Sequence, residues 1–144
     1  MSVDRLKALV RDAQDALMKG DVERFVSLCS EDVAFIDPAG EFKGLDGIRL
    51  WSRWLFSWFP RLTFKEAGLI IEGNRVVHEY VFEGRTKEGL SARFPGVAIY
   101  EFKGEKIQQI RNFYDVLTIA KQISKGLAKR AVSSIDKRFK KGLR

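Results

Sequence analysis

The first part of the chain places apolar side chains at the spacings of three and four that one face of an α-helix requires. Residues 3–17 follow this pattern and predict an amphipathic helix that ends near Gly20. Asp21 can cap a second, short helix that carries an apolar face as far as Cys29. The chain is therefore expected to begin with two helices joined by a tight turn.

A third helix is expected from Asp46 to Pro60, and it carries all three tryptophans of the chain. Trp51, Trp54 and Trp58 are spaced by three and four residues, so they share one helical face. Such a stripe could stack bases or sugars, but it more often belongs to the core. We expect it to line whatever space the helix covers.

Alternation with a period of two replaces the helical spacing after Glu31 and again after Pro60, which predicts strands. Pro38-Ala-Gly40 ends the first strand, and Gly73-Asn74 predicts a tight hairpin. Pro95-Gly96 interrupts a later strand and indicates a bulge or an edge. The predicted strands are residues 32–37, 61–72, 75–85, 90–102 and 106–115.

The order helix, helix, strand, helix and four-stranded antiparallel meander is typical of an α+β fold rather than of a parallel α/β sheet. The chain has 144 residues, and 45% of them are hydrophobic. This fits one domain with a substantial core and excludes general disorder.

The C-terminal segment, residues 116–144, differs from the rest in charge. It holds nine Lys and Arg but one acid, Asp136, whereas residues 1–115 hold 17 basic and 18 acidic residues. Apolar residues recur at every fourth position, which predicts either one helix that wraps a curved surface or two helices hinged near Ser133-Ser134. Asp115 is expected to cap the start of this helical extension.

Three uses of the basic segment are open. It could fold over the domain or across a dimer, lie on an anionic membrane, or bind nucleic acid phosphates. We favour a solvated charged face opposite a packed apolar stripe, because Ile119, Ile123, Ile135, Phe139 and Leu143 need to be covered. Membrane or nucleic acid binding through this segment is therefore not the favoured prediction.

Several classes of protein and site are excluded by what the sequence lacks. Cys29 is the single cysteine, so no intrachain disulfide forms, and its apolar helical face favours a small buried side chain over a nucleophile. One histidine and one cysteine do not make a typical zinc site, and no phosphate-binding glycine motif is present. We expect no metal and no cofactor.

The N-terminus does not resemble a signal peptide, so we expect a cytoplasmic protein.

Several short stretches resemble the ketosteroid isomerase and SnoaL-like branch of the nuclear transport factor 2-like superfamily. They are Gly20-Asp21, Ser30-Glu-Asp-Val-Ala-Phe-Ile-Asp-Pro-Ala-Gly40, Pro95-Gly96-Val97 and Ile110-Arg-Asn-Phe-Tyr-Asp115, with the run from Asp115 to Gln122. The resemblance covers residues 3–126 and implies a curved antiparallel sheet that forms a cone around a pocket, closed by the N-terminal helices. On this basis residues 1–115 form the pocket domain, residues 116–144 extend it, and a homodimer is expected.

Asp37 is the main candidate for a catalytic residue. It ends the row Val33, Phe35 and Asp37 on one face of the first strand, and burying an ionised carboxylate there is costly. Such a group is suited to act as a general base. The resemblance aligns Asp37-Pro38 with the proton-shuttling aspartate of ketosteroid isomerase and its following proline. The alternative is a turn residue whose carboxylate caps local N–H groups.

Other catalytic residues of the enzymes that the chain resembles are absent. The resemblance places the two hydrogen-bond donors of ketosteroid isomerase near Ala13 and Ala98, and alanine cannot donate to an enolate oxygen. In the limonene epoxide hydrolase relatives, an acidic residue lies near Asn112, and asparagine cannot act as a base. Steroid isomerisation and epoxide hydrolysis by those mechanisms are therefore not expected.

Side chains alternate between the two faces of a strand, and this strand parity gives the remaining pocket residues. The predicted catalytic set is Asp37 as base, with His78, Tyr100 and Asn112 polarising or orienting the substrate. The lone histidine, His78, could equally be a core or rim residue. The predicted substrate-binding residues are Phe35, Trp51, Trp54, Tyr80, Phe82, Ala98, Phe102, Ile110 and Tyr114.

These residues favour a SnoaL-like enzyme that performs proton transfer or water addition on a small, largely apolar carbonyl compound. A non-catalytic module that binds a small apolar molecule is the first alternative. An interaction protein that uses its basic segment is the second.

Overall fold

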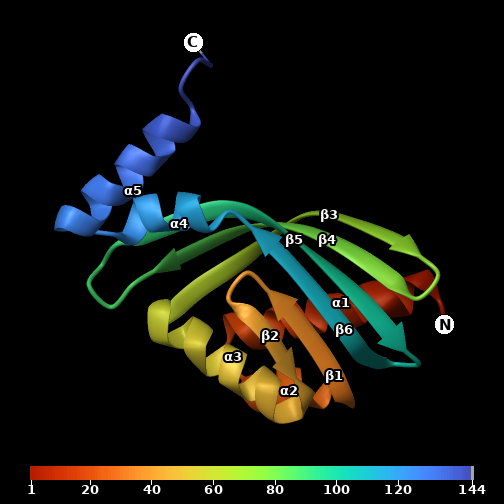
Figure 1. Ribbon diagram of the computed structural model, residues 1–144. Helices are drawn as coiled ribbons and strands as arrows, with labels where there is room; N and C mark the ends of the chain where they lie inside the picture. The colour runs from red at the N-terminus through yellow and green to blue at the C-terminus, as the bar shows by residue number, and fades with distance from the viewer. Residues whose placement is uncertain (144) are drawn as a thin grey trace.

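The computed structural model describes residues 1–143 and places the N-terminal helices against one face of a single curved sheet (Figure 1). The α+β fold predicted from the sequence is confirmed. The elements in chain order are α1 (Val3–Met18), α2 (Val22–Ser27), β1 (Cys29–Asp37), β2 (Gly40–Lys43), α3 (Gly44–Trp58), β3 (Arg61–Glu72), β4 (Arg75–Arg85), β5 (Ser91–Lys103), β6 (Lys106–Tyr114), α4 (Val116–Ile123) and α5 (Gly126–Phe139).

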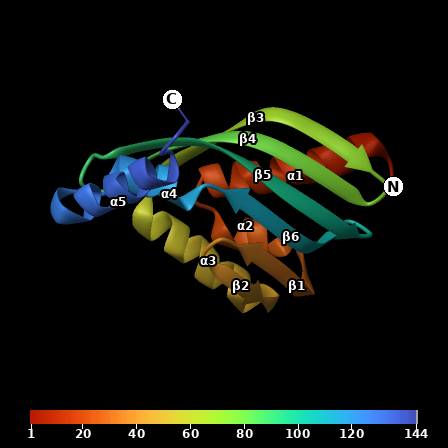
Figure 2. The ribbon, with the colours of Figure 1, turned by 45° about the horizontal axis from the view of Figure 1, so that its top comes forward.

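The six strands are ordered β2-β1-β6-β5-β4-β3, and the sheet curves without closing (Figures 1 and 2). Strands β3 to β6 form the expected antiparallel meander. Strand β1 joins the meander by parallel pairing with β6, with Phe35 opposite Ile110. This pairing brings the end of β1, and so Asp37, beside the end of β6.

Two local predictions differ from the structure. A short strand, β2, pairs with β1 where the sequence predicted only a turn, because four residues are too few to show alternation. Strand β5 keeps regular pairing with β4 through Pro95-Gly96, and its register shift toward β6 lies between Glu101 and Phe102. The edge expected at Pro95 is present, because β6 ends at Tyr114, opposite Gly96.

The core lies between the sheet and helices α1 to α3. Val10 from α1, Phe25 from α2 and Ile48 from α3 are almost completely buried, as are Val76 and Ile107 from the sheet. Cys29 belongs to the same core, and burial raises the pKa of its thiol to about 12. The predicted small buried side chain is confirmed, and a thiol with such a pKa is not a nucleophile near neutral pH. The predicted helical position of Cys29 is wrong, because α2 ends at Ser27 and Cys29 begins β1.

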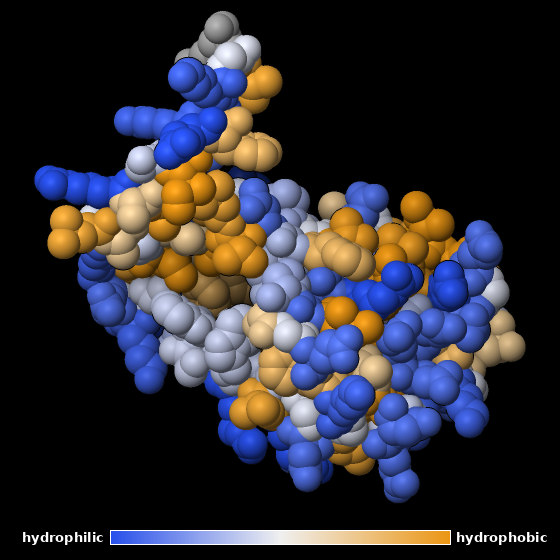
Figure 3. Space-filling model, viewed as in Figure 1, coloured by the Kyte–Doolittle hydropathy of each residue, from blue (hydrophilic) through white to orange (hydrophobic). Residues whose placement is uncertain are grey.

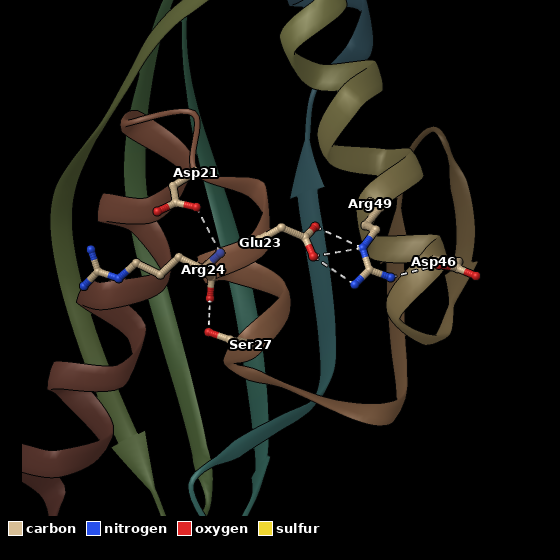
Figure 4. Close-up of polar contacts among 6 residues, drawn as sticks. All are labelled: Asp21, Glu23, Arg24, Ser27, Asp46 and Arg49. Atoms are coloured by element: carbon tan, nitrogen blue, oxygen red, sulfur yellow. Dashed lines mark hydrogen bonds and ion pairs between the residues drawn. The ribbon is translucent and has the colours of Figure 1, made fainter.

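An arginine of α3 forms an ion pair with α2 (Figure 4). The Arg49 guanidinium lies 3.0 Å from Glu23 on α2 and 2.9 Å from Asp46 on its own helix. The backbone N–H of Arg24 donates to the Asp21 carboxylate, which caps α2 as predicted. The Arg49 contacts link the outer sides of α2 and α3.

The C-terminal segment forms two helices, and the break lies at Ser124 and Lys125 rather than near Ser133-Ser134. Gly126 begins α5 with a φ of 59°, a backbone conformation that glycine adopts readily. The Asp115 carboxylate accepts the backbone N–H of Leu117 at 2.9 Å, so the predicted cap of α4 is present. Helix α4 packs on β5, whereas α5 extends past α4 at the end of the molecule (Figures 1 and 2).

Candidate functional site

A cavity of about 360 Å³ lies between the inner face of the sheet, α3 and α4. Most of its wall is aromatic or aliphatic, and three polar side chains meet at one place on the wall. The lining residues are Pro38, Ala39, Trp51, Trp54, Leu55, Trp58, Phe59, Phe64, Tyr80, Phe82, Phe94, Asn112, Tyr114, Val116, Ile119, Ala120 and Ile123.

The tryptophan stripe of α3 forms one wall, as the sequence predicted. Trp51 is buried and its ring stacks on Phe35 with centroids 4.3 Å apart, whereas Trp54 and Trp58 are partly exposed. Phe35 therefore supports the wall from behind and is not itself among the lining residues. Aromatic walls of this kind favour a flat, apolar ligand.

Helix α4 forms the wall opposite, through Val116, Ile119, Ala120 and Ile123. Gln122 fastens the helix to the exposed end of β5: its side-chain oxygen accepts the Arg93 N–H at 2.6 Å, and its amide donates to the Arg93 carbonyl at 2.8 Å. The amide of Gln122 thus replaces a strand partner that β5 lacks at this point.

Asp37 lies behind the polar part of the wall and is 7% exposed. Its Oδ1 accepts Nδ2–H of Asn112 at 2.9 Å, and its Oδ2 accepts the Tyr114 hydroxyl at 2.8 Å. The Tyr80 hydroxyl donates to Oδ1 of Asn112 at 2.8 Å. The three polar residues of the wall are thus linked, directly or through Asn112, to one buried carboxylate.

The direction of these hydrogen bonds follows from chemistry. An ionised carboxylate only accepts, so Tyr114 and Asn112 both donate to Asp37, and the remaining oxygen of Asn112 accepts from Tyr80. Both phenol oxygens keep unused lone pairs, and Asn112 keeps a second N–H. The polar part of the cavity can therefore accept hydrogen bonds at two phenol oxygens and donate one hydrogen bond from an amide.

Burial raises the pKa of Tyr80 and of Tyr114, and the nearby Asp37 charge raises both further. Their hydroxyls stay protonated at neutral pH, which keeps the hydrogen-bond directions fixed.

Asp37 also has the local contact expected of a turn residue. Its Oδ2 accepts the Ala39 N–H at 2.9 Å, inside the turn between β1 and β2. The two interpretations of Asp37 are therefore compatible in geometry, since one carboxylate both stabilises the turn and receives the wall hydrogen bonds.

Several residues predicted to line the site lie in the core instead of at the cavity wall. His78 is 1% exposed, stacks against Tyr80, and has no hydrogen-bond partner at Nδ1. Burial lowers the pKa of His78. Tyr100 accepts a hydrogen bond from Gln14 of α1, and burial raises its pKa. The remaining buried members of the predicted set are Ala98, Phe102 and Ile110.

The cavity also contains residues that the sequence did not single out. Phe94 shares the parity of Ala98 and Tyr100 on β5, so the signal was present, but the bulge expected at Pro95-Gly96 obscured it. Phe64 shares the parity of buried Leu62 on β3, so its signal was present but was not used. Phe59 lies between α3 and β3, where strand parity gives no position.

Among residues 1–143 no group of three His, Cys, Asp or Glu side chains is placed to hold a metal ion. No helix within the same residues is long and apolar enough to cross a membrane.

The fold and the cavity define the class of protein: a curved-sheet α+β protein of the nuclear transport factor 2-like type. Residues 10–110 match the family model described as the SnoaL-like domain, so the chain belongs to this family. The resemblance predicted from the sequence is thereby confirmed. None of the curated proteins searched matches the chain.

Solved structures show the same fold at low sequence identity. A proposed SnoaL-like polyketide cyclase from Jannaschia sp. CCS1 is 18% identical, with a TM-score of 0.80 over 88% of this chain and 97% of the other. A proposed polyketide cyclase from Xanthomonas campestris pv. campestris is 21% identical, with a TM-score of 0.79 over 84% and 98%. TerC, co-crystallised with polyporic acid, is 17% identical, with a TM-score of 0.76 over 83% and 98%.

Proposed function

We propose that this protein binds a small, largely apolar carbonyl compound in the aromatic cavity and catalyses a proton transfer on it, with Asp37 as the final proton acceptor. The observation that carries the proposal is the linked set Tyr114, Asn112 and Asp37 at the polar part of an otherwise apolar wall. A carboxylate screened from water and connected to the cavity by a hydroxyl is suited to acid–base catalysis.

The residues have separate roles in this scheme. The second N–H of Asn112 donates to the substrate carbonyl and stabilises the negative charge that develops on its oxygen. Tyr114 accepts the proton that leaves the carbon next to the carbonyl, and its own proton passes to Asp37 over the 2.8 Å hydrogen bond. Reversing the relay at another carbon completes an isomerisation. In a cyclisation, the enolate carbon forms a bond to a second carbonyl carbon of the substrate, the π bond of that carbonyl breaks, and the relayed proton goes to its oxygen.

The substrate class follows from the shape and chemistry of the wall. Tryptophans of α3, phenylalanines of the sheet and aliphatic side chains of α4 line the cavity, which suits an apolar ring system, and the polar groups gather at one place. The two proposed polyketide cyclases and the complex of TerC with polyporic acid among the similar structures support a polyketide or an organic acid as the ligand.

The experiment uses α-tetralone, a bicyclic ketone, as the probe. Its exchange of α-protons for deuterium in deuterated water is followed by NMR, with and without the protein. The wild-type protein is expected to accelerate the exchange, and Asp37→Asn to lose at least about a hundredfold of that acceleration. Asp32→Asn, an exposed aspartate of the same strand, is the matched control. Equal exchange in the two variants would contradict the role of Asp37.

A non-catalytic binding module is the second candidate, and one observation favours it. Asp37 is not among the lining residues, because Asn112 and Tyr114 lie between it and the cavity. Quenching of the three wall tryptophans by α-tetralone, without any acceleration of exchange by the wild-type protein, would support this module over the enzyme.

Two further predictions from the sequence are kept as proposals. Homodimerisation is supported by the outer face of the sheet, where Val97 lies opposite Phe113 and Val77 opposite Ile99. Within residues 1–143, no helix covers this face (Figure 1). A cytoplasmic location stays a prediction from the sequence.

A further inference from the structure

Helix α5 presents an apolar face that nothing in the described chain covers. Leu127 is 79% exposed, Ile135 58% and Phe139 81%. At 100° per residue, these side chains and those of Ala128, Ala131 and the half-buried Val132 fall within an arc of about 140°. The stripe that the sequence predicted to be packed is therefore divided: Ile119 and Ile123 pack against the core, and the part on α5 faces solvent.

The rest of the helix surface is basic. Lys129, Arg130 and Lys137 lie on the side away from the apolar arc, whereas Arg138 lies within the arc, between Leu127 and Ala131. In the space-filling view, hydrophilic side chains extend from one side of α5 and hydrophobic ones from the other (Figure 3). Within residues 1–143 none of these four cations has an ion-pair partner.

The one acid of α5 does not offset this charge. The Asp136 carboxylate lies 3.1 Å from Lys121 on α4 and 3.1 Å from Lys140. These contacts lower the pKa of Asp136 and fasten α5 to α4 through its half-buried side. The apolar arc and the free cations therefore stay available together.

We propose that α5 docks the protein on membrane surfaces that contain anionic lipids. An exposed apolar arc inserts between headgroups, and long cationic side chains beside it reach the lipid phosphates and carboxylates. Nucleic acid phosphates would bind the cations, but they would leave the exposed Leu127, Ile135 and Phe139 without an apolar partner. A second copy of the chain would cover the apolar arc but would bring more positive charge to it.

The test is flotation of the full chain with vesicles of phosphatidylcholine alone and of phosphatidylcholine and phosphatidylserine in about a 7:3 ratio. The bound fraction is expected to be roughly tenfold higher on the anionic vesicles. The variant Leu127→Ser with Ile135→Ser and Phe139→Ser should lose this binding. These side chains are exposed, so the urea unfolding midpoint should not change.

The contribution of the α5 cations is tested by two triple variants that remove the same number of positive charges from different places. Arg130→Gln with Lys137→Gln and Arg138→Gln should lose the preference for anionic vesicles. Lys43→Gln with Arg61→Gln and Lys103→Gln removes the same charge from exposed positions of the body and should keep it.

Four results would overturn the proposal. The wild type could bind both vesicle types equally weakly, or the serine variant could bind anionic vesicles as fully as the wild type. The two charge variants could lose the preference for anionic vesicles equally, or the serine variant could change its oligomeric mass while neither it nor the wild type binds vesicles. Binding to duplex DNA that depends on the α5 cations, with none to vesicles, would point to nucleic acid instead. None of these measurements involves the cavity, so they do not depend on the proposed catalysis.

Discussion

A variant of Tyr114 distinguishes two routes for the proton: a relay through the Tyr114 hydroxyl and direct abstraction by Asp37. Its hydroxyl lies between the cavity and Asp37, so Tyr114→Phe removes the connection while keeping the ring in the wall. We expect Tyr114→Phe to lose most of the α-tetralone exchange, about a hundredfold, while tryptophan quenching shows binding within a few-fold of wild type. Exchange retained in Tyr114→Phe but lost in Asp37→Asn would mean that the proton reaches Asp37 directly.

His78 gives a prediction about stability and pH. Burial lowers its pKa from 6.5; Glu66 opposes this shift and Arg11 adds to it. Above pH 6.5 the histidine is neutral in both states and contributes nothing. Below it, the unfolded chain binds a proton that the folded chain resists, so the free energy of unfolding falls as the pH falls toward the lowered pKa.

Urea unfolding of the wild type and of His78→Gln checks this. The wild type should lose stability when the pH drops about one unit below 6.5, and the variant should lose clearly less over the same interval. The lowered carboxylate pKa values, such as that of Glu66, affect stability only at more acidic pH. The same pH dependence in both proteins would show that His78 is not the group that titrates.

Strand parity predicted which side chains point inward, but it did not predict what they meet. Tyr80, Phe82, Asn112 and Tyr114 reach the cavity as expected. His78 and Tyr100 share their face but lie farther along the strands, where α1 fills the space, as the hydrogen bond from Gln14 to Tyr100 shows. Alternation gives the face of a strand, whereas depth in the fold depends on helix packing that a single sequence does not encode locally.

At the scale of elements, Gly96 of β5 is required by the tyrosine beside it. A Cβ at Gly96 would lie 2.3 Å from the Tyr80 hydroxyl oxygen and ring. Gly96→Ala should displace Tyr80 from Asn112 and destabilise the fold by about 1–3 kcal/mol. Gly68→Ala, whose Cβ would meet only Glu79 at 3.8 Å, is the control, and both are compared by urea unfolding. A Gly96→Ala protein as stable as the control would contradict the packing described.

Helix α4 gives the second prediction at this scale. Gln122→Ala removes both hydrogen bonds to Arg93 and should loosen the α4 wall, weakening α-tetralone binding about threefold to tenfold. Gln109→Ala, on β6 and outside the cavity, should leave the affinity unchanged. Equal affinities in the two variants would mean that α4 is held by its apolar contacts alone.

Helices and long strands were predictable because their periodicity extends over many residues. The break at Ser124-Lys125 was not predicted, because the apolar residues recur every fourth position on both sides of it. Gly126 was the available signal, and its positive φ explains why the chain turns there.

For the whole molecule, the parallel pairing of β1 with β6 assembles the site. It joins Asp37 to Asn112 and Tyr114 across 75 and 77 residues of sequence. Local patterns cannot reveal such a pairing, and the resemblance to the SnoaL-like family implied only that both segments belong to one cone, without their parallel pairing.

The proposed homodimer is the prediction that belongs to this scale. Phe113 is 50% exposed on the outer face of the sheet, and Phe113→Glu should convert a dimer into a monomer in sedimentation experiments. Phe139→Glu, on α5, is the matched control and should stay dimeric. A monomeric wild type, or dissociation only in the α5 variant, would contradict an interface on the sheet.

The most direct test of the central claim is a crystal structure of the complex with α-tetralone. The bound ketone is expected between the tryptophans of α3 and the phenylalanines of the sheet, with its oxygen within hydrogen-bonding distance of Nδ2 of Asn112 and its α-carbon next to the Tyr114 hydroxyl. A ketone oxygen directed at α4, with only hydrocarbon against Asn112 and Tyr114, would contradict it.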